Sequence, residues 1–118
     1  MEIEQLVGHY HIIGTNQDEG ATTYKGHLEL GLDGHRCIWA KWQIGADQEQ
    51  SGTGFFKDNI LVINFAYKGT SNKIYKGVVV FRCLTPDILD GFWSEKHGDP
   101  NYLGTERAFR VNDDTILN

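Results

Sequence analysis

Hydrophobic and polar residues alternate along most of the chain, a two-residue period that is typical of β-strands with one buried face. No stretch of useful length carries the spacing of an amphipathic helix. The alternation predicts strands at about residues 8–14, 22–31, 35–44, 48–57, 60–67, 73–83, 88–94 and 103–111. Because the connections between them are short, we expect each strand to pair with the next as an antiparallel hairpin.

Turn residues set the register of these hairpins. Asp58 and Asn59 form a two-residue turn, which places Phe56 opposite Leu61. In the following hairpin the same face continues, with Phe81 opposite Leu61. A slip of one residue would turn every side chain to the other face, so these turns decide which residues are buried.

The turn around Gly34 allows two registers. A two-residue turn would direct the apolar residues of the third strand to the wrong face. We therefore expect a three-residue loop with Gly34 in the left-handed conformation, which places Leu28 opposite Ile38 and Tyr24 opposite Trp42.

One set of inward-facing residues satisfies all the hairpins from the second strand to the seventh. It comprises Tyr24, Gly26, Leu28, Leu30, Ile38, Ala40, Trp42, Ile44, Gly52, Gly54, Phe56, Leu61, Ile63, Phe65, Tyr75, Gly77, Val79, Phe81, Cys83, Leu89, Gly91 and Trp93. Glycines recur beside large rings, which permits strong bending of the sheet. We expect an all-β, up-and-down antiparallel barrel of eight strands that occupies residues 1–118 as one domain. A sandwich of two sheets is the alternative.

The two ends of this barrel differ. The turns at 32–34, 58–59 and 84–87 are tight, and the residues before the first strand, Ile3, Leu6 and Val7, could plug that end. Longer polar loops lie at the other end, which we call the mouth; it carries Gln17, Asp18, Glu19, Asp47, Glu49, Glu95, His97 and Asp99.

Composition and charge limit the kinds of partner that the protein can bind and the cellular compartment in which it is expected. The net charge of −5 and the scattered basic residues argue against nucleic acid. The acidic start is too short in apolar residues for a signal peptide, and no apolar run approaches the roughly 20 residues of a membrane span. Cys37 and Cys83 have opposite strand parity, so they should not pair. We therefore expect a reduced, cytoplasmic protein without a cofactor.

Several short motifs resemble those of known barrels. They are Gly8-His9-Tyr10, Tyr24-Lys25-Gly26, Trp42, Ser51-Gly52-Thr53-Gly54, Leu89-Asp90-Gly91-Phe92-Trp93 and Gly104-Thr105-Glu106. Together they span nearly the whole chain and resemble the calycin-like barrels of the lipocalin and avidin (streptavidin) type, and more narrowly a group of small bacterial fibronectin-binding-like barrels of unassigned activity. The biotin-contacting residues of avidins do not map onto this chain, so the resemblance implies no biotin site.

An interior ligand site is the main functional hypothesis. A barrel of eight strands is just wide enough to be filled by its own side chains or to hold one small ligand. The residues expected to bind a small apolar or aromatic molecule are Tyr24, Trp42, Gln50, Tyr75, Trp93 and Glu106. A barrel filled by its own side chains, acting through its outer face, is the alternative.

The eighth strand leaves one question open. Gly104 and Ala108 direct Glu106 inward, whereas the parity of Phe109 would direct Arg107 inward instead. A buried Glu106 could bind a ligand donor, or act as the acid/base of an isomerase or cyclase together with a Tyr hydroxyl. It could equally be paired with a neighbour for structural reasons, which is the more common role of a buried charge. On balance the sequence favours a binding protein over an enzyme.

Histidines give a weaker candidate for chemistry. His9 and His11 share a face, and the first hairpin could set His9 opposite His27, a group that could bind a transition metal. The register puts them on the outer face, where a fortuitous surface cluster is the better interpretation. His97 lies in a polar loop without a partner at defined spacing.

The outer face carries an apolar row. Trp39, Phe55, Val62, Val80 and Phe92 are predicted to line up across five neighbouring strands. A contiguous exposed row of this kind is unusual on a monomer, so we expect a homodimer joined through this face.

Overall fold

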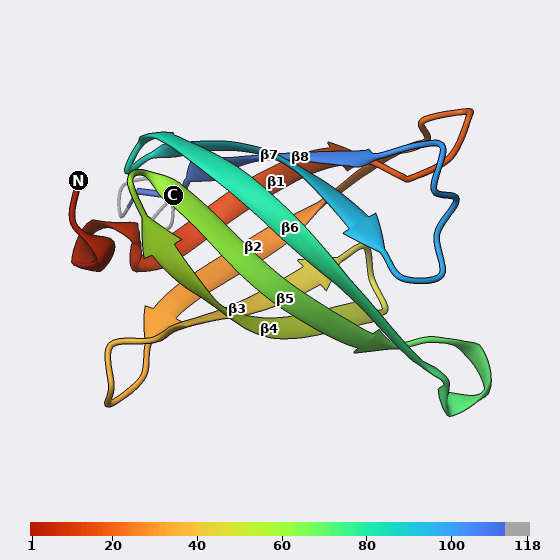
Figure 1. Cartoon of the computed structure of the whole chain (residues 1–118), viewed down its shortest axis with the longest axis horizontal. Helices are drawn as coiled ribbons and strands as arrows, with labels where there is room; N and C mark the ends of the chain where they lie inside the picture. The colour runs from red at the N-terminus through yellow and green to blue at the C-terminus, as the bar shows by residue number, and fades with distance from the viewer. Residues whose placement is uncertain (113–118) are drawn as a thin grey trace.

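The computed structural model describes residues 1–112, which form a closed antiparallel barrel in which each strand pairs with the next and the last returns to the first (Figure 1). The strands are β1 (Gly8–Thr15), β2 (Thr23–Leu32), β3 (Ile38–Ile44), β4 (Gln48–Lys57), β5 (Ile60–Lys68), β6 (Ile74–Thr85), β7 (Ile88–Glu95) and β8 (Gly104–Arg110). Two short 3₁₀ helices, η1 (Ile3–Leu6) and η2 (Thr70–Asn72), lie before β1 and between β5 and β6. The predicted up-and-down barrel is confirmed, and the two-sheet sandwich is wrong.

The register from β4 to β7 agrees with the prediction. Phe56 pairs with Leu61, and Phe81 lies opposite both Leu61 and Gly91. Asp58 and Asn59 both have positive φ (52° and 63°), as a two-residue hairpin turn with matching twist requires.

The register between β2 and β3 differs from the prediction by four residues. Leu28 pairs with Trp42, not with Ile38. Tyr24 lies beyond the β2–β3 ladder and pairs with Gly14 of β1. Because four is an even number, the same residues still face inward.

The β2–β3 loop explains this shift. The Asp33 carboxylate accepts the backbone N–H groups of His35 (2.7 Å) and Cys37 (3.0 Å), so a longer loop replaces the three-residue one. The left-handed conformation is taken by Arg36 (φ 61°), whereas Gly34 has no positive φ.

The end of the barrel beside η1 is closed. Leu6 is fully buried there, whereas Val7 is exposed and does not contribute to the plug. The buried Tyr10 hydroxyl donates to the backbone oxygen of Leu6 (2.7 Å), and Arg110 donates to the same hydroxyl (2.9 Å). Arg110 also donates to the backbone oxygens of Val7 (2.9 Å) and Pro86 (3.0 Å). These bonds attach the start of the chain to β8 and to the β6–β7 turn.

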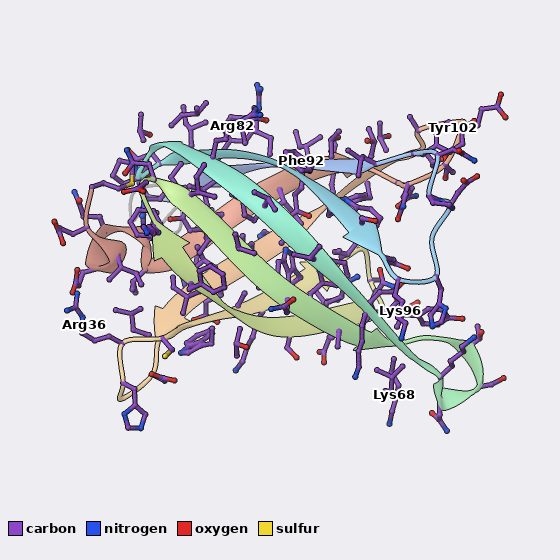
Figure 2. All side chains as sticks on the ribbon, viewed as in Figure 1. Arg36, Lys68, Arg82, Phe92, Lys96 and Tyr102 are labelled. Carbon is purple, nitrogen blue, oxygen red and sulfur yellow. The ribbon has the colours of Figure 1, made fainter. Side chains whose placement is uncertain are left out.

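The mouth lies at the opposite end. Figure 2 labels Arg36 near the closed end and Lys68, Lys96 and Tyr102 at the other, where the β1–β2, β5–β6 and β7–β8 connections project. The tight β4–β5 and β6–β7 turns and the three longer mouth loops are as predicted. The β2–β3 loop at the closed end has five residues (33–37) and the β3–β4 turn at the mouth has three (45–47), so these two connections differ from the prediction.

Candidate ligand-binding site

The barrel holds a cavity of about 230 Å³ toward the mouth. It is lined by Asn16, Tyr24, Trp42, Ile44, Gln48, Gln50, Phe65, Tyr67, Val79, Trp93, Glu95 and Glu106. Five residues that the sequence assigned to a lumen site are therefore together in it: Tyr24, Trp42, Gln50, Trp93 and Glu106.

Glu106 lies at the inner end of this cavity and is 4% exposed. Its neighbours on the adjacent strands are Gly14 of β1 and Gly91 of β7, where an added Cβ would meet the Tyr24 ring (2.3 Å) and the Phe81 ring (2.8 Å) respectively. The Tyr24 hydroxyl donates to Oε1 (2.7 Å), and Trp42 Nε1 donates to Oε2 (2.9 Å). Burial raises the pKa of Glu106 to about 7, although both hydrogen bonds oppose the shift.

Glu106, and not Arg107, is therefore the β8 residue that faces inward. Arg107 points outward and pairs with Asp90 of β7 (3.3 Å). Phe109, whose parity suggested the opposite, is exposed on the outer face. No bulge is needed in β8, because Gly104, Glu106 and Ala108 alternate inward without interruption.

Aromatic rings form the walls of the cavity. Phe65 lies between two indoles, with its centroid 6.1 Å from that of Trp42 and 6.2 Å from that of Trp93, both edge to face. Tyr24 lies 6.4 Å from Trp93 on the other side. Burial, followed by the adjacent Glu106 carboxyl, raises the pKa of the Tyr24 hydroxyl, so this group stays a hydrogen-bond donor.

Tyr67 and Glu95 form the outer part of the cavity. The Tyr67 hydroxyl donates to Glu95 Oε1 (2.5 Å), and burial together with this carboxylate raises the pKa of Tyr67. Glu95 was expected at the mouth, whereas Tyr67 was not among the residues expected to line the ligand site. The signal was present, since the inward series Leu61, Ile63 and Phe65 reaches Tyr67 at the next step of two.

Tyr75 is placed differently from the prediction. It does not line the cavity; its ring stacks on Tyr67 (centroids 5.4 Å apart) and meets the edge of His97 (6.1 Å). The ring also covers Gly69, where an added Cβ would lie 2.2 Å from the Tyr75 ring. Tyr75 is therefore a residue of the rim.

A buried glutamine organises the mouth. Gln17 accepts the backbone N–H of Glu95 at Oε1 (2.9 Å) and donates through Nε2 to the backbone oxygen of Asp99 (2.9 Å) and to Ser94 Oγ (3.3 Å). These bonds join the β1–β2 loop to β7 and to the β7–β8 loop. The remaining mouth residues named above, Asp18, Glu19, Asp47, Glu49, His97 and Asp99, are exposed.

The histidines do not form the group of three that was considered above as a weak metal-site candidate. His11, rather than His9, lies opposite His27, with ring centroids 4.9 Å apart, and His9 pairs with Glu29 (3.7 Å). Within residues 1–112, no group of three His, Cys, Asp or Glu side chains could hold a metal ion.

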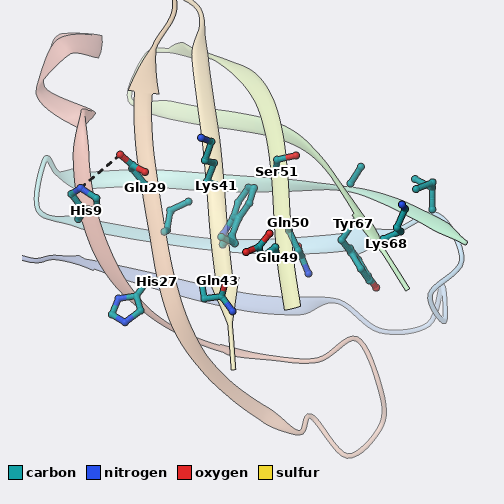
Figure 3. A pocket seen from close by; sticks show the side chains of 14 residues that line it. His9, His27, Glu29, Lys41, Gln43, Glu49, Gln50, Ser51, Tyr67 and Lys68 are labelled. Carbon is teal, nitrogen blue, oxygen red and sulfur yellow. Dashed lines mark ion pairs between the residues drawn. The ribbon is translucent and has the colours of Figure 1, made fainter. Parts of the chain in front are cut away.

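A larger but open groove crosses the outer face of β1 to β6. Figure 3 shows His9 and Glu29 joined by their ion pair, with Lys41, Glu49 and Lys68 on neighbouring strands. Half of its lining residues are exposed, and they carry both signs of charge. The cavity inside the barrel is less open than this groove and is the better candidate for a small-molecule site, because such sites bury most of their ligand.

The outer apolar row is shorter than predicted. Phe55, Val62, Val80 and Phe92 lie directly opposite one another on β4 to β7, and Phe55 is 62% exposed. Trp39 falls outside this row, because it pairs with Thr53 and Gly31, and its ring covers Gly31.

The two cysteines are free, as their parity predicts. Cys37 is exposed, and Cys83 faces the core, where burial raises the pKa of its thiol to about 11. None of the helices in the described part of the chain has the length and apolar character needed to cross a membrane.

Comparisons with known proteins support the fold without assigning a family. No protein-family model matches the chain, and no curated protein matches its sequence. A redesigned β-barrel has a TM-score of 0.77 at 16% identity, covering 93% of this chain and 95% of its own. Two further redesigned barrels, mFAP0 and mFAP1, are solved bound to DFHBI. Their TM-scores are 0.69 and 0.71 at 19% and 18% identity, covering 90% and 92% of this chain and 99% and 97% of their own. At these identities the likeness shows a shared eight-stranded antiparallel barrel.

Proposed function

We propose that the protein binds a small, ring-containing molecule in the barrel lumen, and that this molecule enters the lumen from the mouth. The observation that carries this proposal is the cavity, walled by Trp42, Phe65 and Trp93 and ending at the buried Glu106 carboxyl. Binding sites for small molecules combine hydrophobic and aromatic walls with converging polar groups, and this cavity has both.

The size of the cavity limits the ligand. A cavity of about 150 Å³ with apolar walls accommodates benzene. The 230 Å³ found here therefore has room for a molecule of one or two rings. The mFAP0 and mFAP1 barrels, which bind DFHBI, support the idea that a barrel of this architecture can hold a small molecule, as does the resemblance to lipocalin- and avidin-type barrels.

A panel of one- and two-ring compounds, neutral, cationic and anionic, tests the proposal. Binding is measured by thermal unfolding and by calorimetry. A compound at 100 times its Kd should stabilise the protein by about 2.7 kcal/mol. I44F fills the cavity from its wall and should weaken binding by at least about tenfold. The matched control Q43F adds the same ring to the adjacent outward residue and should leave binding unchanged. If no compound binds, or if I44F binds as well as the wild type, the lumen is not the site.

The outer row supports a second proposal, that two copies of the chain associate through it. The exposed Phe55 and its opposite neighbours Val62, Val80 and Phe92 offer an apolar centre for a sheet-on-sheet contact. Light scattering after gel filtration should report a dimer that F55S converts to monomer. K57S, on the same face of β4 beyond the row, should remain dimeric. A monomeric wild type at high concentration would contradict this second proposal.

A further inference from the structure

The titratable side chains that line the cavity are carboxylic acids and phenols, with no cation among them. Its titratable residues are Glu106 of β8, Glu95 of β7, Tyr24 of β2 and Tyr67 of β5, and none of the described lining residues is Lys, Arg or His. We infer, building on the proposed lumen site, that the ligand is an aromatic or alicyclic amine whose protonated nitrogen binds the Glu106 carboxylate.

The hydrogen bonds at the inner end favour a ligand that donates. Each Glu106 oxygen accepts one bond, from Tyr24 or from Trp42, and a carboxylate oxygen can accept another. Trp93 Nε1 is also occupied, because it donates to the backbone oxygen of Thr105 (3.3 Å), whereas Asn16, Gln48 and Gln50 add uncharged amides to the lining. At the Glu106 carboxyl itself, a ligand carbonyl would meet a donor only if Glu106 were protonated, whereas an ammonium group meets a ready acceptor.

The aromatic walls suit a cation as well. Trp42 is both a hydrogen-bond donor to Glu106 and a neighbour of Phe65 in the cavity wall. The faces of indole rings attract ammonium groups, and more strongly where water is excluded. A buried ammonium group needs an opposite charge beside it, and Glu106 provides one at 4% exposure.

The outer part of the cavity carries a second acid. Glu95 lines its outer part, and the exposed Asp18, Glu19 and Asp99 belong to the loops that surround the entrance. The lysines at the same end, of which Lys68 and Lys96 are labelled in Figure 2, are exposed and do not line the cavity. The exposed acids of these loops do not line the cavity either, so the charges that a ligand meets inside it are those of Glu95 and Glu106.

The amine hypothesis predicts a definite pH dependence. Because the pKa of Glu106 is about 7, much of the free protein carries a neutral carboxyl at neutral pH, and binding an ammonium group releases that proton. Affinity should therefore fall about tenfold between pH 8 and pH 6. A ligand that accepts a hydrogen bond from neutral Glu106 would show the opposite trend.

Three matched probes test the inference by calorimetry: 2-phenylethylamine, 2-phenylethanol and phenylacetate. We expect the amine to bind most tightly at pH 8, to bind about tenfold more weakly at pH 6, and to release protons, measured by comparing buffers of different ionisation enthalpy. E106Q should weaken amine binding at least about tenfold and abolish its pH dependence. The Gln side chain can still accept from Trp42 while its amide donates to the Tyr24 hydroxyl, so the cavity is retained. The buffer comparison uses the wild type alone, and so tests the inference even if E106Q fails to fold.

The other outcomes separate this inference from the proposed function. If the alcohol or phenylacetate binds as tightly as the amine, and I44F abolishes that binding, the lumen is the site but the amine assignment is wrong. Amine binding that E106Q leaves unchanged has the same meaning. If none of the three probes binds the wild type, both the amine assignment and the lumen site are overturned.

Discussion

Replacement of Glu106 by Gln should change how the stability of the barrel depends on pH. In the unfolded chain the carboxyl titrates at its ordinary pKa of 4.5, whereas in the folded protein its pKa is about 7. Between these values the folded state keeps a proton that the unfolded state has released, so the free energy of unfolding falls as pH rises. The loss is small below pH 4.5 and complete above pH 7.

The magnitude follows from the two pKa values. The folded-state pKa lies about 2.5 above the unfolded-state pKa, which corresponds to about 3 kcal/mol in the free energy of unfolding. About 2.5 kcal/mol of this is lost between pH 5 and pH 8. E106Q lacks this titration. Relative to the variant, the wild type should therefore lose about 2.5 kcal/mol over that interval. Any pH-independent effect of the new amide shifts the stability difference between the two proteins equally at every pH, so the change of that difference with pH stays the same.

Urea unfolding of both proteins at pH 5, 6, 7 and 8 measures this difference. Comparing the pair removes the contribution of other groups, such as Asp33, whose pKa is lowered by backbone hydrogen bonds from Cys37 and His35. A difference that stays constant within about 0.5 kcal/mol would refute the reasoning, because Glu106 would then titrate alike in the folded and unfolded states. A wild type that gains stability relative to E106Q as pH rises would show that Glu106 is held as a carboxylate by its partners.

Three other substitutions, two of them with a matched control variant, test the closed end, the close approach of two strands and the mouth. R110M removes the donor that joins the closed end and should lower the free energy of unfolding by about 2–3 kcal/mol, measured in urea. The control R107M breaks only a surface ion pair and should cost less than about 1 kcal/mol. G54A should cost more than about 2 kcal/mol because its Cβ would overlap a backbone oxygen of β5, whereas G34A, with nothing within 4 Å, should be nearly neutral in the same assay. Q17A should accelerate amide hydrogen exchange in the β7–β8 loop without affecting the closed end.

The alternation of residues determined the faces of the strands, but not all of their pairings. The turn at Asp58 and Asn59 was recognisable because both residues tolerate positive φ, and the register from β4 to β7 followed from it. The loop after β2 was not, because the carboxylate of Asp33 competes with the expected glycine turn and Arg36 takes the left-handed position. Side-chain bonds of this kind have no periodic signature.

The site was predicted in the same partial way. Inward parity brought Tyr24, Trp42 and Glu106 into one group, and the structure joins them by hydrogen bonds. Tyr75 has the same parity, yet at the end of a strand parity no longer fixes where a ring lies, and this ring turns onto Tyr67. The distinction depends on packing at the rim, which involves loops that alternation does not describe.

The pairing of β1 with β8, the seam of the barrel, has a consequence for the order in which the strands assemble during folding. It joins Tyr10 to Arg110, residues 100 positions apart, whereas the other seven strand pairs are hairpins. Contacts between distant residues carry the larger entropic cost, so we expect this seam to close after the local hairpins have formed. Glu106 belongs to β8, and the lumen is therefore complete only when the last strand has docked. A lumen ligand recognises the finished barrel alone, so it slows unfolding without speeding the assembly of the strands.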